Sequence, residues 1–451
     1  MSQSTKFSPR ASLIALGNYL QNTVIWQIIE QEVDINQKVL KHTPTDKLKD
    51  AWLSMLAGAQ SLVELNTLVR PDKALQQAFG RESCADQSTV SETLNSCDET
   101  NVKQMRTATK RIYQRYGKGF KHHYGKQMQI LDVDMSGLVC GEQAEGADKG
   151  YFPNQKGKRG RQLGRVVASR YDEVVVDRLY AGKRQLNKSL TELILATEDV
   201  LELDETRRSQ TLVRVDSGGG KADHINWVLK REYSILVKSV NWRYAHQQAA
   251  QVEQWVQDPR RPDRELAWCP EPLEFEQDTQ QFLIRKHTSK GKTKISLVIA
   301  KLPDDLLAEQ TELPVTSAQE RLIALAYLYD QRGGGVETQF KNSKQGLGLH
   351  RRNKKSFAAQ EMLVLLAQLA HNLMIWMRNA LAVAAHPRFR KYGVLRLVRD
   401  VCQIAGQIVF DEHGNICEIR LNHHHPLARY LVCLRRTLQR QSDSTLNLGE
   451  I

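Results

Sequence analysis

The chain has 451 residues, of which 41% are hydrophobic, and its 64 Lys and Arg residues exceed its 51 Asp and Glu residues to give a formal net charge of +13. Enough apolar side chains are present to bury a sizeable core, which excludes a disordered protein. The basic balance favours a polyanionic partner such as nucleic acid, because Lys and Arg side chains that neutralise phosphates release counterions. Chain length alone suggests about three domains.

The cysteines and the hydrophobic segments indicate where the protein resides. The seven cysteines are dispersed and form no Cys-x-x-Cys pair, which is typical of a reducing cytosol and argues against a zinc site. The first residues, MSQSTKFSPR, do not have the pattern of a signal peptide. The most hydrophobic segment, residues 357–377, includes Glu361, His371 and Asn372, and it is therefore predicted to be a buried core helix rather than a membrane span. We expect a cytoplasmic protein without a membrane partner.

Residues 1–125 are predicted to be all-helical. Apolar residues recur at helical spacing over residues 13–31, 47–68 and 102–116, and no strand pattern of comparable strength is present. Between these segments, residues 86–94 offer capping residues and then a short polar helix. Such a helix could present Ser, Thr and Gln side chains to DNA, with an ordinary surface helix as the alternative.

Strands and helices alternate from residue 126 onwards. The pattern predicts the order strand, strand, strand, helix, strand, helix, strand, which indicates an α/β sheet with helical crossovers. The predicted strands are residues 128–135, 165–168, 173–179, 212–215 and 233–240, and the predicted helices are residues 186–203 and 222–232.

The remaining chain first breaks this alternation and then returns to helices. A β-rich insertion is predicted to contain the antiparallel strands 281–287 and 294–300. Helices are predicted at residues 317–329, 336–344, 356–377, 392–404 and 426–438, with a hairpin at 407–410 and 416–421. The predicted domains are a helical DNA-binding domain (1–125), a catalytic core in two parts (126–240 and 304–385), the insertion (241–303) and a helix-hairpin-helix extension (386–451).

Three carboxylates lie where a metal site could form. Asp134 is near the end of the first predicted strand, and Asp216 ends a later strand before the glycines of residues 218–220. Glu337 opens a predicted helix after the triple glycine of residues 333–335. Ligands of open α/β sheets gather outside the carboxyl ends of strands, and glycines there would let a substrate approach closely. Taken singly, such residues are more often turn, cap or helix-dipole partners, but together they indicate a metal site.

Asp132 competes with Asp134 for the first position of this site. The two residues are separated by one position, so on a strand they point to the same face. Asp134 is preferred because it is nearer the strand end and is followed by the small residues Ser136 and Gly137. Asp132 then either supports the ligand or is itself the ligand.

The element order and the carboxylate positions resemble the ribonuclease-H-like core of DDE transposases, and most of all those bacterial insertion-sequence transposases that carry a Tyr-Arg-Glu-Lys signature. The signature here is Tyr329, Arg332, Glu337 and Lys344. The Tyr-to-Arg and Glu-to-Lys spacings match the family, whereas the Arg-to-Glu spacing is one residue longer because of the triple glycine.

Two further segments support the resemblance, which covers roughly residues 126–380. Residues 131–134 (LDVD) and 214–218 (RVDSG) look like the first and second motifs of the family. The β-rich insertion before the last carboxylate is also similar. The resemblance implies a mixed α/β core in which Asp134, Asp216 and Glu337 hold Mg²⁺, for which Mn²⁺ can substitute.

The implied chemistry agrees with the residue types. Carboxylates are the hard oxygen ligands that Mg²⁺ prefers, and two such ions about 3.5–4 Å apart can serve the attacking and the leaving oxygen of a phosphodiester. A strand of DNA would be cut, and its 3′-OH would attack a second phosphodiester. The expected partners are double-stranded DNA at the element ends and at the target, and a second copy of the chain, with no nucleotide cofactor. The expected location is the bacterial nucleoid.

The resemblance and the charge pattern also assign DNA-binding residues. The resemblance implies that Arg332 and Lys344 hold phosphates near the scissile bond and that Tyr329 packs or bonds there too. Lys341 shares a helix face with Glu337 and Lys344 by the i, i+4, i+7 spacing, for which surface salt bridges are the alternative interpretation. The basic run of residues 350–355 is predicted to bind phosphate as well, through Arg351, Arg352, Lys354 and Lys355. A second basic stretch is residues 156–165.

Some assignments stay open from the sequence. Trp242, Trp255 and Trp268 flank or occupy the insertion, where an aromatic side chain of similar transposases stacks on a flipped base, yet core packing is the better interpretation for any one of them. Residues 423–425, three consecutive histidines, are interpreted as exposed strand-end polarity. Two other functions remain possible: a DNA-binding protein descended from a transposase without its chemistry, and a ribonuclease-H-like nuclease without strand transfer.

Overall fold

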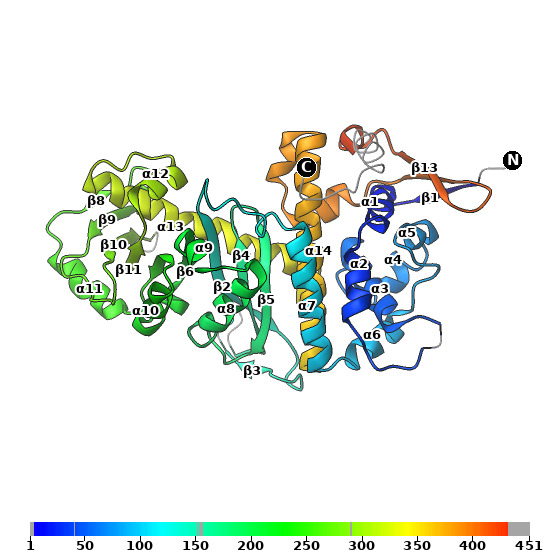
Figure 1. Cartoon of the computed structure of the whole chain (residues 1–451), viewed down its shortest axis with the longest axis horizontal. Helices are drawn as coiled ribbons and strands as arrows, with labels where there is room; N and C mark the ends of the chain where they lie inside the picture. Colours follow the sequence, from blue (N-terminus) through cyan, green and yellow to red (C-terminus); the bar gives the residue numbers. More distant parts are fainter. Residues whose placement is uncertain (1–3, 40, 151, 153–156, 289–290, 432–451) are drawn as a thin grey trace. The chain divides into compact units, whose positions relative to one another are not determined.

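The computed structural model describes residues 4–431 except 40, 151, 153–156 and 289–290. The chain forms two compact units (Figure 1). Unit 1 contains Met1–Lys118, Leu138–Arg161 and Gln339–Ile451, and unit 2 contains Gly119–Gly137 and Gln162–Thr338. Each unit is a compact body rather than a domain defined by function, so the domain boundaries expected from the sequence stay predictions.

Unit 2 is built on a large mixed sheet in which β4-β2-β6-β7-β11-β10-β9-β8 are successive neighbours, β5 also pairs with β4, and the first residues of β4 pair with the short strand β3 (Asp148–Lys149). Strands β2, β6 and β7 run parallel, and β11, β10, β9 and β8 continue the sheet in antiparallel fashion from β7. The predicted α/β alternation and the predicted hairpin of the insertion are thus confirmed. The bounds are β2 (Gln129–Val139), β4 (Arg159–Ala168), β5 (Glu173–Ala181), β6 (Thr211–Val215), β7 (Ser234–Lys238), β8 (Val256–Gln257), β9 (Arg264–Trp268), β10 (Gln280–His287) and β11 (Thr293–Lys301).

Helices cover both faces of this sheet (Figure 1). Alternate residues of β10 and β11 point to opposite faces. Phe282 and Val298 pack with the apolar residues of α12 and α13, whereas Leu283 and Leu297 pack under α11. The helical elements of unit 2 are η1 (Leu186–Lys188), α8 (Leu190–Leu201), α9 (Glu205–Ser209), η2 (Ser217–Gly219), α10 (Ala222–Lys230), α11 (Trp242–Gln251), α12 (Asp304–Thr311) and α13 (Ala318–Lys341).

Helix α13 corrects the sequence prediction at the triple glycine. Two helices were expected, with Glu337 opening the second, but the helix is continuous from Ala318 to Lys341. Glycine in a helix interior costs about 1 kcal/mol relative to alanine, which is a penalty rather than a stop. Burial of Leu322, Leu325, Leu328 and Val336 offsets this penalty, because these side chains lie in the core. Glu337 therefore lies near the C-terminal end of a long helix.

Unit 1 is mostly helical and is organised around α14 (Phe357–Ala384). This helix packs against α3, α6 and α7, and most of its side chains are buried, as predicted for a core helix. Within the described residues, no helix has the length and hydrophobicity required to cross a bilayer. The other helices of the N-terminal part are α1 (Ala11–Gln21), α2 (Ile25–Glu32), α3 (Pro44–Leu56), α4 (Leu65–Leu68), α5 (Lys73–Ala78), α6 (Gln87–Asn95) and α7 (Glu99–Tyr116).

The N-terminal part is not all-helical, contrary to the prediction. Strand β1 (Ser4–Ser8) pairs with β12 (Gly406–Phe410), which pairs with β13 (Ile416–Leu421). Four of the five β1 residues are exposed, so the strand has no local apolar pattern and exists because of a pairing about four hundred residues away. The predicted hairpin of β12 and β13 is confirmed. The predicted helices at 13–31 and 47–68 are each interrupted.

The C-terminal part is less regular than predicted. Short turns replace the expected helix at 392–404: η5 (Pro387–Lys391), α15 (Val394–Arg396) and the π-helical turn η6 (Leu397–Val401). The expected last helix falls mainly on residues from 432 onwards, which lie outside the described residues. Unit 1 also contains β3 (Asp148–Lys149), the π-helical turn η3 (Asn342–Gly346) and η4 (Leu349–Arg351).

Candidate active site

Two of the predicted carboxylates meet at one edge of the unit 2 sheet. Strands β2 and β6 pair in parallel up to Val133 and Val215. Asp134 and Asp216 are the next residue on each strand path, so the register brings them side by side. Asp134 lies within β2, which continues to Val139, and not at the strand end as predicted. Asp134 still lies beside Asp216, because the pairing of β2 with β6 stops at Val133 although β2 itself continues.

Arg332 of α13 joins all three predicted carboxylates. Its Nη1 lies 3.3 Å from Oδ2 of Asp134, and its Nη2 lies 3.5 Å from Oδ2 of Asp216 and 4.0 Å from Oε1 of Glu337. The guanidinium is 6% exposed, whereas the Glu337 side chain is 63% exposed. Tyr329, one turn earlier, donates its hydroxyl to Oδ1 of Asp216 over 3.1 Å. Three signature residues, Tyr329, Arg332 and Glu337, thus form one polar cluster with the two aspartates.

The two aspartates of the cluster differ in acidity. Burial raises the pKa of Asp134 above its ordinary value, and the Asp216 carboxylate adds to this while Arg332 opposes it. Burial also acts to raise the pKa of Asp216, but Arg332, the Ser217 backbone N–H and Lys238 together bring it below its ordinary value. Burial and the neighbouring Asp216 raise the pKa of Tyr329, which therefore keeps its proton at neutral pH.

Asp132 is engaged elsewhere. Its side chain is fully buried and accepts two hydrogen bonds from Arg214, Nε to Oδ1 at 2.6 Å and Nη2 to Oδ2 at 2.8 Å, and one from the Ser169 hydroxyl. A Cβ on Gly335 would lie 2.7 Å from Oδ2 of Asp132, so α13 can approach this carboxylate only through glycine. Asp132 therefore links β2 to β6 through Arg214, which also donates to the Leu328 carbonyl of α13, and both oxygens of Asp132 already accept hydrogen bonds.

Arg214 is a site-supporting residue that the sequence interpretation missed. The sequence contained a signal for this contact. Asp132 and Arg214 each precede a candidate carboxylate by two residues, so if the two carboxylates are neighbours on paired strands, Asp132 and Arg214 are neighbours as well. Lys238 at the end of β7 was also missed, although its charge helps to lower the pKa of Asp216.

The glycines after Asp216 serve packing rather than substrate approach. A Cβ on Gly220 would lie 1.9 Å from the carbonyl oxygen of Lys238, and one on Gly219 would lie 2.6 Å from a methyl of Val215. The glycine run thus lets the chain turn tightly between β6 and α10. In α13, by contrast, a Cβ on Gly333 or Gly334 would meet nothing within 4 Å.

The basic run after α13 is only partly available to DNA. Arg351 and Lys355 are exposed, as phosphate binding requires. Arg352 is 3% exposed and donates from Nη2 to the Ala59 carbonyl over 2.7 Å, and its burial lowers its pKa to about 10. Lys354 is half-buried and donates to the carbonyl and hydroxyl of Ser91. Arg352 and Lys354 are therefore structural, which corrects their predicted role.

The second basic stretch and the helix-face prediction also need correction. Arg161 is buried and donates to the carbonyls of Glu145 and Lys355, and Arg165 is fully buried in a pair with Asp177. The donors of Arg161 are thus used by backbone carbonyls, and the charge of Arg165 is neutralised by Asp177. The α-helix ends at Lys341, and Lys344 lies in the π-helical turn η3, so the regular spacing that would align both with Glu337 does not extend to Lys344. Lys341 is exposed and Lys344 is half-buried.

The tryptophans of the insertion have different environments. Trp268 packs against the core of the sheet, edge-on to Phe282 with 6.4 Å between ring centroids, as expected for core packing. Trp255 lies under the guanidinium of Arg285 at 3.9 Å. Trp242, at the first turn of α11, is 63% exposed and is thus the tryptophan of the three that is accessible to a partner.

The donor set of the cluster is suited to a hard divalent cation. Three carboxylates facing one guanidinium supply the oxygen ligands that Mg²⁺ prefers. As placed, however, they meet through Arg332 and not with one another: across the described part of the chain, no three His, Cys, Asp or Glu side chains are gathered closely enough to hold a metal ion. Asp134, Asp216 and Glu337 would hold such a cation only if Arg332 gave up its ion pairs with them.

Comparisons with known proteins identify the family. No curated protein matches the chain. Among solved structures, the chain is similar to a piggyBac transposase in the cryo-EM structure of its synaptic complex with hairpin DNA, with a TM-score of 0.47 and 12% sequence identity over 99% of this chain and 88% of that chain. The family model described as "Transposase DDE domain group 1" matches residues 6–443, nearly the whole chain. The chain therefore belongs to the family of transposases with a DDE domain.

Proposed function

We propose that this protein is an active transposase that cuts the ends of a DNA element and joins the 3′-OH ends to target DNA. The observation that carries the proposal is the convergence of Asp134, Asp216 and Glu337 on one guanidinium at the edge of the sheet. Membership of the DDE transposase family supports it. A protein that had lost its chemistry would be free to lose one of these carboxylates, and all three are present.

In this proposal the three carboxylates hold divalent cations, Mg²⁺ or Mn²⁺. Such cations, when bound, activate a nucleophile and stabilise the leaving oxygen of a phosphodiester. Arg332 then turns from the carboxylates to a DNA phosphate, for which its bidentate fork is suited. Tyr329 keeps Asp216 oriented by its hydrogen bond. The exposed side chains of Lys341, Arg351 and Lys355 offer further phosphate contacts.

The finer classification is part of the same proposal. The order β5-β4-β2-β6-β7, with β2, β6 and β7 parallel, supports a ribonuclease-H-like core. The signature of Tyr329, Arg332, Glu337 and Lys344 supports the Tyr-Arg-Glu-Lys subgroup of bacterial insertion sequences. We further propose that two copies act together on paired element ends, in the nucleoid of a bacterial cytoplasm, and that residues 1–125 contribute to DNA binding.

Substitution of the carboxylates tests the proposal. Asp134→Asn, Asp216→Asn and Glu337→Gln should each reduce Mg²⁺-dependent cleavage of element-end DNA by at least about 10³-fold, because each removes a charged oxygen ligand while preserving shape. Cleavage and joining are measured on end DNA with a target plasmid, and end binding is measured by gel shift. Binding should stay within about threefold of the wild-type value, since the substitutions do not remove a phosphate contact.

Two outcomes separate the alternatives. Wild-type cleavage no faster than that of the Glu337→Gln variant would contradict an enzymatic function and leave a DNA-binding protein. Cleavage by the wild type without joining to the plasmid would indicate a nuclease. An exposed carboxylate outside the cluster, Glu253, provides the matched control, because Glu253→Gln should cleave and join as the wild type does.

A further inference from the structure

Unit 1 contains a polar cavity of about 720 Å³ that has no role in the candidate active site. Its lining comes from four stretches of chain: the segment before α3, the start of α3, the segment leading into α5, and the loop that leads into α6. Among the charged residues of the lining, the basic ones outnumber the acidic ones, and they are Lys38, Lys41, Lys47, Arg70 and Lys73. We call this feature the basic cavity.

The positive charges of the basic cavity are not neutralised by the protein. Lys38, Lys41, Arg70 and Lys73 are exposed, and within the part of the chain that the structure describes none of the four forms an ion pair. The carboxylates in the lining are those of Asp86 and Glu92. Asp86 is occupied as the N-cap of α6, where it accepts hydrogen bonds from the backbone N–H groups of Ser88 and Thr89. The lining therefore keeps an excess of positive charge.

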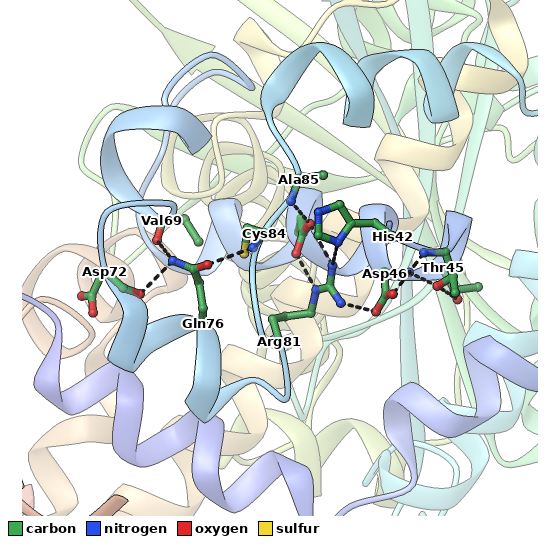
Figure 2. A network of polar contacts seen from close by, with 11 residues as sticks. His42, Thr45, Asp46, Val69, Asp72, Gln76, Arg81, Cys84 and Ala85 are labelled. Carbon is green, nitrogen blue, oxygen red and sulfur yellow. Dashed lines mark hydrogen bonds and ion pairs between the residues drawn. The ribbon is translucent and has the colours of Figure 1, made fainter. Parts of the chain in front are cut away.

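A buried polar network holds the walls of the basic cavity in place (Figure 2). Arg81 bonds both oxygens of the fully buried Asp50, at 2.8 and 3.3 Å, and also contacts Asp46 and Nδ1 of His42. The second oxygen of Asp50 accepts from the backbone N–H of Ala85 over 2.8 Å. These bonds fix the loop before α6 to α3 and to the segment that carries Lys41.

The amide of Gln76 fixes the opposite wall. Its Nε2 donates to the carbonyls of Val69 and Arg70, and its Oε1 accepts from the backbone N–H of Cys84 over 2.8 Å (Figure 2). The backbone of Arg70 is thus joined to the loop before α6. A cavity whose walls are already ordered loses little conformational entropy when a ligand binds.

We propose that the basic cavity binds the phosphate backbone of duplex DNA. A site for a small free anion requires buried donors that converge on one point, but the buried cations here are already engaged. Lys47 of the lining donates to Oε1 of Gln37 over 3.1 Å, and Arg81 behind the lining is neutralised by Asp46 and Asp50. The available cations are instead exposed and spread over separate segments, which suits a chain of phosphates. Thr89 and Glu92 place one side of α6 in the same lining. Backbone contacts at the basic cavity would position α6 on the duplex without reading sequence.

The proposal rests on the proposed action of this chain on DNA, and a charge-neutral variant tests it separately. In the full-length protein, Lys41→Gln, Arg70→Gln and Lys73→Gln are combined, and binding to element-end DNA and to an unrelated duplex is measured over a range of salt concentrations. We expect weaker binding to both duplexes by a similar factor of about tenfold or more. We also expect the slope of log affinity against log salt to fall by about 3, since each lost phosphate contact removes about 1.

Two control variants make the result specific. Lys103→Gln, Arg390→Gln and Lys391→Gln remove three exposed charges from other parts of unit 1, so they reproduce the change in net charge alone and should leave the slope unchanged. The charge-retaining combination of Lys41→Arg, Arg70→Lys and Lys73→Arg should restore wild-type binding. Equal thermal unfolding midpoints for all variants exclude misfolding, because exposed substitutions change stability little.

The outcomes distinguish this inference from the proposed function. A slope and affinity equal to those of the wild type would overturn the inference even if the enzyme cuts and joins DNA. The same reduced slope in both charge-neutral combinations would also overturn it, because only net charge would then matter. A reduced slope specific to the basic cavity in a protein that cuts no DNA would support the inference and contradict the proposed function. Inorganic phosphate that binds the wild type but not the cavity variant, with DNA binding unchanged, would indicate a small-anion site instead.

Discussion

Two aspartates separated by one residue on β2 have opposite surroundings. Asp132 is fully buried and paired with Arg214, whereas Asp134 is half-buried and shares Arg332 with two other carboxylates. A fully buried carboxylate that is paired with an arginine and accepts a further hydrogen bond from a serine is poorly suited to bind a metal ion. The geometry therefore favours Asp134 as the metal ligand and Asp132 as its support. From the sequence alone, the two residues could be distinguished only by their distance from the end of the predicted strand.

Asp132→Asn should lower the free energy of unfolding by about 3–5 kcal/mol, because it leaves the buried charge of Arg214 uncompensated. Asp134→Asn should change that free energy by no more than about 1 kcal/mol, because the ion pair of Asp134 with Arg332 is longer than that of Asp132 with Arg214 and is partly exposed. Denaturant unfolding of both variants measures the difference, with Mg²⁺ affinity determined by calorimetry. An Asp132 variant of wild-type stability that no longer binds Mg²⁺ would reverse the two assignments.

The side chain of Lys354 also has a measurable consequence for stability. Burial lowers its pKa from 10.5 to about 8, although the Cys97 thiol opposes this. Between pH 8 and 10.5 the unfolded chain therefore binds more protons than the folded chain at this residue, and the free energy of unfolding rises with pH. Relative to Lys354→Met, the wild type should gain thermal stability from pH 7.5 to pH 10.5, on the order of a few degrees.

The exposed neighbour of Lys354 is the control for this measurement. Lys355→Met should follow the pH dependence of the wild type, because Lys355 is exposed. If the unfolding temperatures of the wild type and Lys354→Met changed equally between pH 7.5 and pH 10.5, the ammonium group of Lys354 would not be buried.

At the scale of elements, α13 carries both the signature residues and three consecutive glycines. The glycines are not equivalent: Gly335 faces Asp132, whereas Gly333 and Gly334 face open space. Only at Gly335 does a neighbouring atom exclude a side chain. The absence of a side chain at Gly335 lets this part of the helix lie close to Asp132 of β2.

Alanine substitutions separate the three glycines. Gly333→Ala and Gly334→Ala should each stabilise the protein by up to about 1 kcal/mol, because alanine is the better helix former and its methyl meets no neighbour. Gly335→Ala should destabilise it by about 1–3 kcal/mol, because its methyl would overlap Oδ2 of Asp132. Denaturant unfolding measures all three. Equal effects at the three positions would contradict the close approach of α13 to β2.

The alternation of strands and helices made the sheet of unit 2 predictable. Buried strands such as β6 and β7 are short apolar runs bounded by polar or glycine residues, and the carboxyl ends of parallel strands share one edge. That reasoning, with the family resemblance, predicts that Asp134, Asp216 and Glu337 belong to one site. The prediction was wrong where it treated the triple glycine as a helix boundary, because tertiary packing outweighs local propensity.

At the scale of the whole molecule, features without a local signal could not be predicted. Strand β1 forms only because β12 lies beside it, and its own residues are exposed. Burial of a charged residue is equally non-local: Arg161, Arg165 and Arg352 read as a basic surface in sequence, yet each is buried by partners distant in the chain. Counting charges along a sequence therefore overestimates the surface that is available to DNA.

The position of Arg332 has a consequence for how the molecule tolerates an empty site. Three carboxylates close together would repel one another, so a cluster that depended on metal for charge balance would loosen whenever metal was scarce. Arg332 is an internal counterion that removes this dependence. On the proposed function, binding of divalent ions releases the counterion toward the DNA, so that metal and DNA each strengthen the binding of the other by the same factor. The enzyme would thus bind its metals most tightly when the substrate is present.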